Sequence, residues 1–429
     1  MDDSTRPAVL AEVQAELAAL LGWLGEAAGL DLAVAERATR ERVLAVGARL
    51  LEAGLAARGT GKAGPRVPCP CGAEAGFEGY RPKGAQTLVG WVAVRRAYYA
   101  CPGCGHGRCP LDAELGLGRD GHSPGVRSLA GRFGALLPFA QAAATLAEAA
   151  GVRLAAGTVR GVTEGLGARR DAAAVAEADR AWGAGLPPVA GPSPERLYVA
   201  MDGVRILGVA GEGREVKVGV VAPARPAAGK EARGAASYAA SLEPAAAFGR
   251  RLALEAHRRG LEGAAEVAVL GDGAAWIWAL AEEHFPGATC IVDWWHASER
   301  VWALGRARFG DGTPETAAWV DAQLGRLARG EAAALAEEWR ALPCRGEAAA
   351  VRDEQAGYLA NQAPRMRYAE YRAAGWDIGS GMVEGACKHL IGAREKGPGM
   401  RWGDRGANAV AQVRVALFND RWDELPAAA

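Results

Sequence analysis

The segment Leu197-Tyr198-Val199-Ala200-Met201-Asp202-Gly203 begins the part of the chain from which the fold can be predicted. A run of apolar residues before an Asp-Gly pair indicates a buried strand that ends in a turn. Residues 206–209 and 216–221 are also short and apolar. Three strands joined by tight turns are therefore expected, with Asp202 at the carboxyl end of the first.

Two further strands complete this pattern. A helix is expected near residues 244–259, followed by the buried strand Val267-Ala268-Val269-Leu270, which leads into Gly271-Asp272-Gly273-Ala274. Residues 288–292 form the last strand. Three strands, a helix, a strand, a helix and a strand is the order of the ribonuclease H-like fold, so we expect an α/β domain of this class.

Two aspartates of this region share one setting. Asp202 and Asp272 are each expected at the carboxyl end of an apolar strand, with a glycine beside them. That edge of an open sheet binds ligands, and glycine lets a phosphate backbone approach closely. Taken singly, a strand-end Asp-Gly is as often only a turn.

A third carboxylate lies in Gly379-Ser380-Gly381-Met382-Val383-Glu384-Gly385-Ala386-Cys387-Lys388, a flexible turn followed by a predicted helix. Its apolar positions fall at helical spacing and predict one stripe, made of Val383, Ala386, Cys387 and Leu390. Glu384 and Lys388 are four residues apart, which suits a surface ion pair or a shared ligand that carries a metal ion and phosphate. Together with the two aspartates, Glu384 favours a metal-binding triad.

Two close cysteine pairs, Cys69-Pro70-Cys71-Gly72 and Cys101-Pro102-Gly103-Cys104-Gly105, mark a second module. The segment between them is rich in strand formers, and four thiolates close a tetrahedral zinc site. We therefore predict a zinc-ribbon-like module over residues 65–122. Its structural Zn²⁺ ligands would be Cys69, Cys71, Cys101 and Cys104. His106 or Cys109 could replace one ligand, and buried metal-free thiols are the alternative.

Residues 123–190 show a helix, a glycine turn and a second helix, which fits a helix-turn-helix DNA-binding region, with an ordinary helical hairpin as the alternative. The residues expected in the major groove are Thr158, Arg160 and Thr163, and those expected to meet phosphates are Arg153, Arg169 and Arg170. A Pro- and Gly-rich linker follows at residues 186–194. The chain has no net charge, but residues 79–111 carry five basic and no acidic side chains, which favours DNA.

The composition is that of a soluble globular protein, with 50% hydrophobic and 23% charged residues in 429. No apolar run approaches the ~20 residues of a membrane span, and Met1-Asp2-Asp3 does not begin a signal peptide. We therefore expect a cytoplasmic, nucleoid-associated protein. Residues 1–64 are expected to form two helices with an ordinary packing role, although such a pair can also serve in dimerisation.

Six motifs together resemble the ISKra-type insertion-sequence transposases of the DDE superfamily, and the resemblance runs from about Tyr198 to Trp422. The motif around Glu384 is the most specific. The motifs are Met201-Asp202-Gly203, Gly271-Asp272-Gly273-Ala274, Trp276-Ile277-Trp278, Val292-Asp293-Trp294-Trp295-His296, the stretch from Gly379 to Lys388 quoted above, and Gly399-Met400-Arg401-Trp402.

The resemblance implies a ribonuclease H-like catalytic domain over residues 191–429, with an α-helical insertion at about 297–375. It implies a transposase that binds insertion-sequence ends in double-stranded DNA and catalyses strand cleavage and strand transfer, as a homodimer or higher oligomer. Asp202, Asp272 and Glu384 would hold two Mg²⁺ or Mn²⁺ ions for an in-line displacement at phosphorus.

Further site residues follow from motif and charge. Asp293 and His296 resemble a DxxH motif of related transposases, which implies that His296 contacts the scissile phosphate or orders nearby strands; a core histidine is the alternative. Basic residues that follow Glu384 are candidate phosphate contacts, unless they only solvate a helix end. These are Lys388, Arg394, Lys396 and Arg401.

Two other functions remain open. Another ribonuclease H-like nuclease, of the resolvase type, would cut DNA without joining it. A non-catalytic regulator would use only the zinc module and the helix-turn-helix, and it would leave the three carboxylates without a role.

Overall fold

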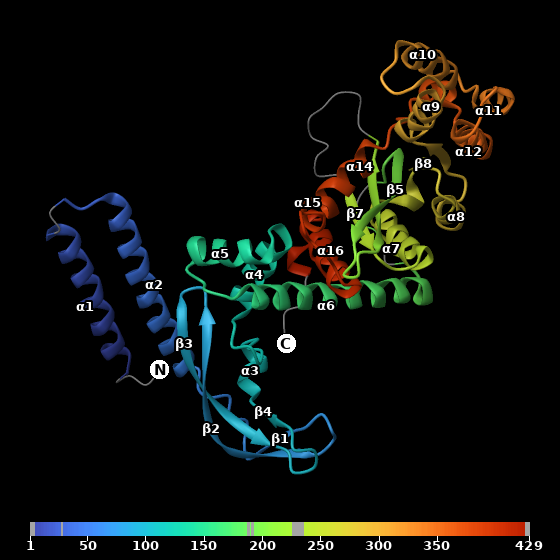
Figure 1. The fold of residues 1–429 in the computed structure, drawn as a ribbon. Coiled ribbons are helices and arrows are strands. Elements are labelled where there is room, and N and C mark those ends of the chain that lie inside the picture. Colours follow the sequence, from blue (N-terminus) through green and yellow to red (C-terminus); the bar gives the residue numbers. More distant parts are fainter. Residues whose placement is uncertain (1–4, 27–28, 187–188, 190–192, 225–235, 425–429) are drawn as a thin grey trace. The chain divides into compact units, whose positions relative to one another are not determined.

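The computed structural model describes residues 5–26, 29–186, 189, 193–224 and 236–424. The chain divides into two compact units, Met1–Leu166 and Gly167–Leu425. One sheet has four strands and the other has five, so the fold is mixed α/β (Figure 1). Most of the predicted linker at 186–194 lies outside the described residues.

The first unit begins with two long helices and an antiparallel sheet in the order β1-β2-β3-β4. Three short or medium helices follow, and α6 starts before the unit ends. The elements are α1 (Thr5–Glu26), α2 (Leu32–Ala57), β1 (Arg66–Pro68), β2 (Glu74–Thr87), β3 (Gly90–Ala100), β4 (Gly107–Arg108), α3 (Pro110–Glu114), α4 (Pro124–Leu136), α5 (Phe139–Ala150) and α6 (Ala156–Ala184).

Helix α1 bears on the prediction that no segment spans a membrane. Its residues Arg6–Glu26 are long and apolar enough to cross a membrane, with a mean hydropathy of 1.3, although a core helix or a signal sequence would pass the same test. From the sequence we expected only that no apolar run approaches the ~20 residues of a membrane span. Glu12 and Glu16 both lie close to Arg49 of α2, at 3.3 and 3.9 Å, so these carboxylates help to hold α1 against α2.

The second unit is built on a sheet in the order β7-β6-β5-β8-β9. β5, β6 and β7 pair antiparallel, whereas β8 and β9 continue the sheet from β5 in parallel. The strands are β5 (Arg196–Leu207), β6 (Gly213–Pro223), β7 (Ser237–Ser241), β8 (Glu266–Gly271) and β9 (Thr289–Val292). Side chains of the central strands, among them Leu197, Val199 and Leu270, are fully buried and form the core.

The strand boundaries differ from the prediction in one respect. Asp202 and Gly203 do not form a turn, because β5 stays paired with β6 from Leu197↔Pro223 to Leu207↔Gly213. The first half of the predicted second strand at 206–209 is therefore the end of β5. The third antiparallel strand is β7, which the sequence pattern did not reveal.

Helices cover this sheet and extend the chain between β9 and the segment that carries Glu384. Figure 1 shows α9 to α12 gathered beside the strands, where a helical insertion was predicted. The helices are α7 (Ala245–Arg258), α8 (Ala275–His284), α9 (Trp294–Phe309), α10 (Pro314–Ala328), α11 (Ala332–Ala341), α12 (Glu347–Gln362), α13 (Tyr368–Ala373), α14 (Gly381–Ala386), α15 (Ala393–Glu395) and α16 (Asp404–Phe418).

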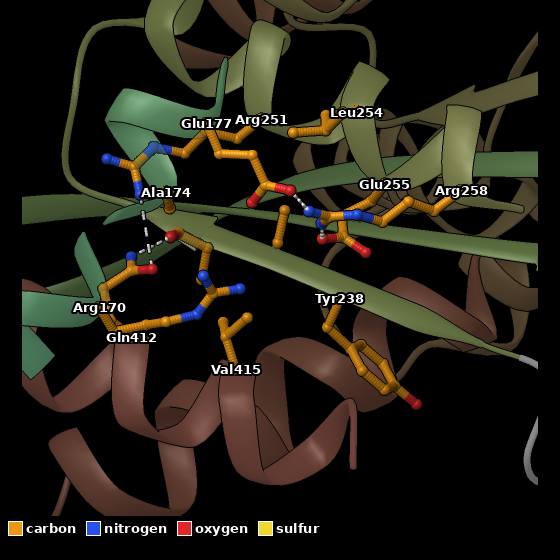
Figure 2. A pocket seen from close by; sticks show the side chains of 12 residues that line it. Arg170, Ala174, Glu177, Tyr238, Arg251, Leu254, Glu255, Arg258, Gln412 and Val415 are labelled. Carbon is orange, nitrogen blue, oxygen red and sulfur yellow. Dashed lines mark hydrogen bonds and ion pairs between the residues drawn. The ribbon is translucent and has the colours of Figure 1, made fainter. Parts of the chain in front are cut away.

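Charged side chains of α6 and α7 pair beside a small cavity that Gln412 and Val415 of α16 also line (Figure 2). Arg251 contacts Asp171 and Glu243, each at 2.8 Å, and Arg258 pairs with Glu177 and Glu255. The cavity between these side chains holds only about 30 Å³, room for about two waters. It is therefore a packing feature of the second unit and not a ligand site.

A glycine sets how closely α6 and α16 approach. A Cβ on Gly167 would lie 1.9 Å from the backbone oxygen of Ala409, so the two backbones touch at this point.

Gly167→Ala should destabilise the second unit by about 1–3 kcal/mol, because overpacking forces the helices apart. Gly183→Ala in the same helix meets open space and should leave stability unchanged or slightly raised. Thermal unfolding followed by circular dichroism measures both; equal midpoints for the two variants would contradict the close approach.

Candidate functional site

Two carboxylates meet at one edge of the second sheet. Parallel pairing of β5 with β8 extends to Ala200↔Leu270, so Asp202 and Asp272 follow at the same level on adjacent chains. The pKa of Asp202 is raised, first because the group is buried and also because Asp272 places a second negative charge nearby. Like charges in a partly dry site favour a bound proton or cation. This part of the predicted triad is therefore brought together.

The Asp272 turn is held by a helix from the insertion. Gly273 has a φ of +101°, and Asp272 Oδ1 accepts a hydrogen bond from Ala274 N at 2.9 Å. The hydroxyl of Tyr358 donates to the backbone oxygen of Asp272 at 2.6 Å, and Gln362 Nε2 donates to that of Gly273 at 2.9 Å. Both side chains come from α12, and no local motif of the sequence pointed to them.

Asp293 and His296 lie beside the two aspartates. Asp293 is fully buried, and its Oδ2 accepts hydrogen bonds from the backbone N–H of His296 at 3.1 Å and from its Nδ1 at 2.9 Å. The Asp293 hydrogen bond raises the pKa of His296, and the charges of Asp202 and Asp272 add to this shift. The raised pKa favours the protonated form of His296, whose side chain is 31% exposed, so it is not a core histidine.

Glu384 lies on α14, close in the chain to the residue that contacts Asp202, but its own partner is Lys388. Its carboxylate accepts a hydrogen bond from Lys388 Nζ at 2.6 Å, and the side chain is 50% exposed. Asp202, Asp272 and Glu384 do not lie within 4.8 Å of one another; among the described residues only four cysteines form so close a group. The surface ion pair is therefore the arrangement observed.

The helix that carries Glu384 nevertheless contacts Asp202. The four residues of the predicted apolar stripe are all buried, which confirms that prediction. Among them, the thiol of Cys387 lies 3.5 Å from Asp202 Oδ2. Because Glu384 and Cys387 are three residues apart on a helix, they lie on neighbouring positions of one face. Glu384 is thus one helical turn from the residue that touches Asp202.

A π-helix, Cys387–Gly392, follows α14. Arg414 of α16 is buried and donates to the backbone oxygens of Leu390 and His389. These bonds satisfy carbonyl groups in a helix type that occurs mostly as single turns, often at functional sites. A distant arginine therefore fixes the chain that leads away from Glu384.

The basic residues after Glu384 do not all face solvent. Lys396 and Arg401 are exposed, and Lys388 is exposed but paired with Glu384. Arg394 is 1% exposed and lies over the Trp402 ring at 5.1 Å, so the prediction that it contacts phosphate is wrong for this structure. Counting local charge could not reveal that Trp402 covers this guanidinium.

The helix-turn-helix residues also divide into exposed and buried groups. Arg160 is exposed on α6 and pairs with Glu164 at 2.7 Å. Thr163 is fully buried and donates to the Val159 backbone oxygen, so it cannot meet a base as predicted. Arg170 is likewise buried within the second unit. Neither buried residue remains a candidate DNA contact.

Four cysteines of the first unit converge. The sulfur atoms of Cys69, Cys71, Cys101 and Cys104 all lie within 4.8 Å of one another, and two of the pairs are at 3.6 Å. Tetrahedral thiolates at Zn–S distances of about 2.3 Å have sulfur atoms roughly 3.8 Å apart, so the cluster fits a structural metal such as zinc. Hydrogen bonding from the Cys104 backbone lowers the pKa of Cys101 to about 7, which favours a thiolate there.

Comparison of the sequence with protein-family models and with curated proteins finds no match. The arrangement of the residues described above therefore carries the functional argument.

The cysteine cluster predicts about one zinc ion per purified chain. Cys71→Ser should release most of it, because three thiolates bind zinc more weakly than four. Cys109→Ser should retain it, since Cys109 lies outside the cluster. Mass spectrometry would measure the zinc content of the wild type, Cys71→Ser and Cys109→Ser. If Cys71→Ser retained its zinc, this set of four ligands would be excluded.

Glu395 predicts a pH dependence of stability. The side chain is 1% exposed, neither carboxylate oxygen has a hydrogen-bond partner, and burial raises its pKa to about 8. From its unfolded pKa to about pH 8, the unfolded chain releases this proton while the folded chain keeps it, so stability falls as pH rises.

Glu395→Gln should therefore match the wild type near pH 4 and exceed its free energy of unfolding by about 1–3 kcal/mol at pH 8. Urea unfolding at both pH values measures the difference. Glu337→Gln, which changes an exposed carboxylate, should be neutral at both. A Glu395→Gln advantage independent of pH would rule out the ionisation as its cause.

Proposed function

We propose that this chain is a metal-dependent DNA transposase that cleaves and joins DNA at insertion-sequence ends. The observation that carries the proposal is that Asp202, within β5, and Asp272, directly after β8, follow the last paired residues of two adjacent parallel strands, with His296 beside them. The strand order, three antiparallel strands followed by two parallel ones, also supports a ribonuclease H-like fold for the second unit.

The donor set fits a hard divalent cation such as Mg²⁺ or Mn²⁺. Asp202 and Asp272 offer carboxylate oxygens, which these ions prefer, and their mutual repulsion gives a cation a reason to bind. If the ion pair between Glu384 and Lys388 were broken, the Glu384 carboxylate would supply the third metal ligand. Two ions held by these carboxylates would supply activation of a water or a DNA 3′-hydroxyl and stabilisation of the leaving oxygen.

The remaining residues have roles that need no metal. His296, whose pKa is raised by its hydrogen bond with Asp293, could donate a hydrogen bond to a phosphate oxygen. Tyr358 and Gln362 fix the backbone of the Asp272 turn, so they position its carboxylate. Lys388, once separated from Glu384, is available to a phosphate.

In this proposal the first unit recognises DNA. The cysteine cluster would act as a zinc ribbon, and α5 with the start of α6 as a helix-turn-helix in which Arg160 faces the duplex. Lys396 and Arg401 are the exposed basic residues of the second unit that would contact the phosphate backbone. The protein would act in the cytoplasm as a homodimer or higher oligomer on DNA.

One observation favours a second candidate, a non-catalytic DNA-binding regulator. Glu384 is paired with Lys388 and does not reach the aspartates. A regulator would bind DNA through the same exposed basic residues but would need no metal at the carboxylate corner.

Substitution of the triad tests the proposal. The substrate is a DNA duplex that carries the sequences flanking the gene on either side, incubated with Mg²⁺ or Mn²⁺. Asp202→Asn, Asp272→Asn and Glu384→Gln should each reduce strand cleavage by more than about a hundredfold, because each removes a carboxylate from the metal site. Gel analysis of end-labelled DNA measures cleavage.

Asp311→Asn, an exposed carboxylate beyond α9, serves as the matched control and should cleave normally. A precleaved 3′ end should also be joined to a second duplex, which a resolvase-type nuclease would not do. Full cleavage by the Glu384→Gln protein would exclude Glu384 from the triad, and DNA binding without any cleavage by the wild type would favour the regulator.

A further inference from the structure

Helix α9 presents a second face that the described part of the chain covers only at one end, where the Phe309 ring lies 6.2 Å from that of Trp319 and 4.7 Å from the Arg308 guanidinium. Its inner face packs on the rest of the insertion through Ala297, Ser298, Val301, Leu304 and Gly305, which are buried. The outer face is exposed at i, i+4, i+7, i+11 and i+14. These positions are Trp295, Glu299, Trp302, Arg306 and Phe309.

The outer face is unusually aromatic for a solvent-facing surface. Trp295, Trp302 and Phe309 are 62%, 38% and 36% exposed. Large aromatic side chains gain most from burial, so three in one line mark a contact surface. The alternating spacing of four and three residues is that of a helix-packing seam.

The charges in this seam identify the partner. Trp295 and Phe309 lie seven residues on either side of Trp302, while Glu299 lies three before it and Arg306 four after it. Within the described residues neither Glu299 nor Arg306 forms an ion pair. An antiparallel copy of the same helix, centred on Trp302, would supply a partner of opposite charge to each.

We propose that two copies of this chain associate by packing α9 against α9 in antiparallel orientation. Trp302 then meets Trp302 of the partner subunit, Trp295 meets Phe309 of the partner subunit, and Glu299 meets Arg306 of the partner subunit. This contact is isologous and closes as a two-fold dimer. A parallel arrangement is excluded by like charges, since it would place Glu299 against its own copy.

The exposed row on α9 begins beside His296, next to the site that contains Asp202 and Asp272. Trp295 precedes His296, and its indole nitrogen would lie 3.6 Å from a Cβ placed on Gly379. Association would therefore cover the outer surface beside Asp293 in each subunit and put the two corners at opposite ends of the paired helices. The dimer contact does not depend on the proposed chemistry. Nucleic acid is the weaker occupant, because Glu299 offsets Arg306 and the row has no net positive charge to attract phosphate.

Charge exchange tests the arrangement in the full-length protein. Glu299→Arg and Arg306→Glu should each weaken dimerisation in sedimentation velocity by more than about tenfold, because each homodimer then contains two like-charge contacts. An equimolar mixture of the two variants should regain dimer, since every contact across the antiparallel seam is again between opposite charges.

Two further variants separate the seam from other contacts. Trp302→Ala should also weaken association by more than about tenfold, because it removes the central anchor. Trp91→Ala, a similarly exposed tryptophan of the first unit, should have no effect. Failure of the mixture to associate more strongly than either variant alone would overturn the proposal. So would loss of DNA binding in Trp302→Ala at an unchanged molecular mass, which would assign the row to nucleic acid.

Discussion

The second unit depends on the buried carboxylate of Asp293. Burying a carboxylate is unfavourable unless it is hydrogen-bonded, and Asp293 accepts bonds from the Ser380 backbone, at 2.5 Å, and from two N–H groups of His296. Its own N–H donates to Gly271 at the end of β8. One side chain thus joins the sheet edge, the start of α9 and the turn before Glu384. These hydrogen bonds lower the pKa of Asp293 despite its burial, so the charge that orders them persists.

Sequence patterns correctly predicted the elements whose structure depends on residues close together in the chain. The stripe from Val383 to Leu390 is buried because a helix places such residues on one face. The CxC and CxxC turns converge because antiparallel strands bring both pairs to one end of the sheet. Asp202 was predicted at a strand end beside Asp272; the neighbour is correct, but the strand end is wrong, since pairing with β6 keeps β5 extended through the Asp-Gly pair. Propensity favoured a turn there, and tertiary pairing overrode it.

Contacts between distant segments could not be anticipated in this way. Tyr358 and Gln362 reach Asp272 and Gly273 from a helix more than eighty residues later in the chain. Arg414 bonds the carbonyls of the π-helix from α16. Thr163 and Arg394 were predicted to be exposed DNA contacts, but both are buried. A polar residue looks exposed in a sequence, yet it is buried wherever a neighbouring helix or ring supplies its partner. Such partners depend on packing, which composition and spacing do not encode.

The separation of Glu384 from the two aspartates is explained by the size of the interactions involved. Three carboxylates repel one another, so the third approaches the pair only with a cation between them. Its bond to Lys388 joins two side chains that are 50% and 69% exposed, and a surface pair of this spacing stabilises a helix by only about 0.3–0.5 kcal/mol. A divalent ion bound by two aspartates, as proposed, would offer Glu384 a far stronger partner. The observed ion pair therefore poses little barrier to a triad, and Lys388, on release, remains one turn away as a cation beside the site.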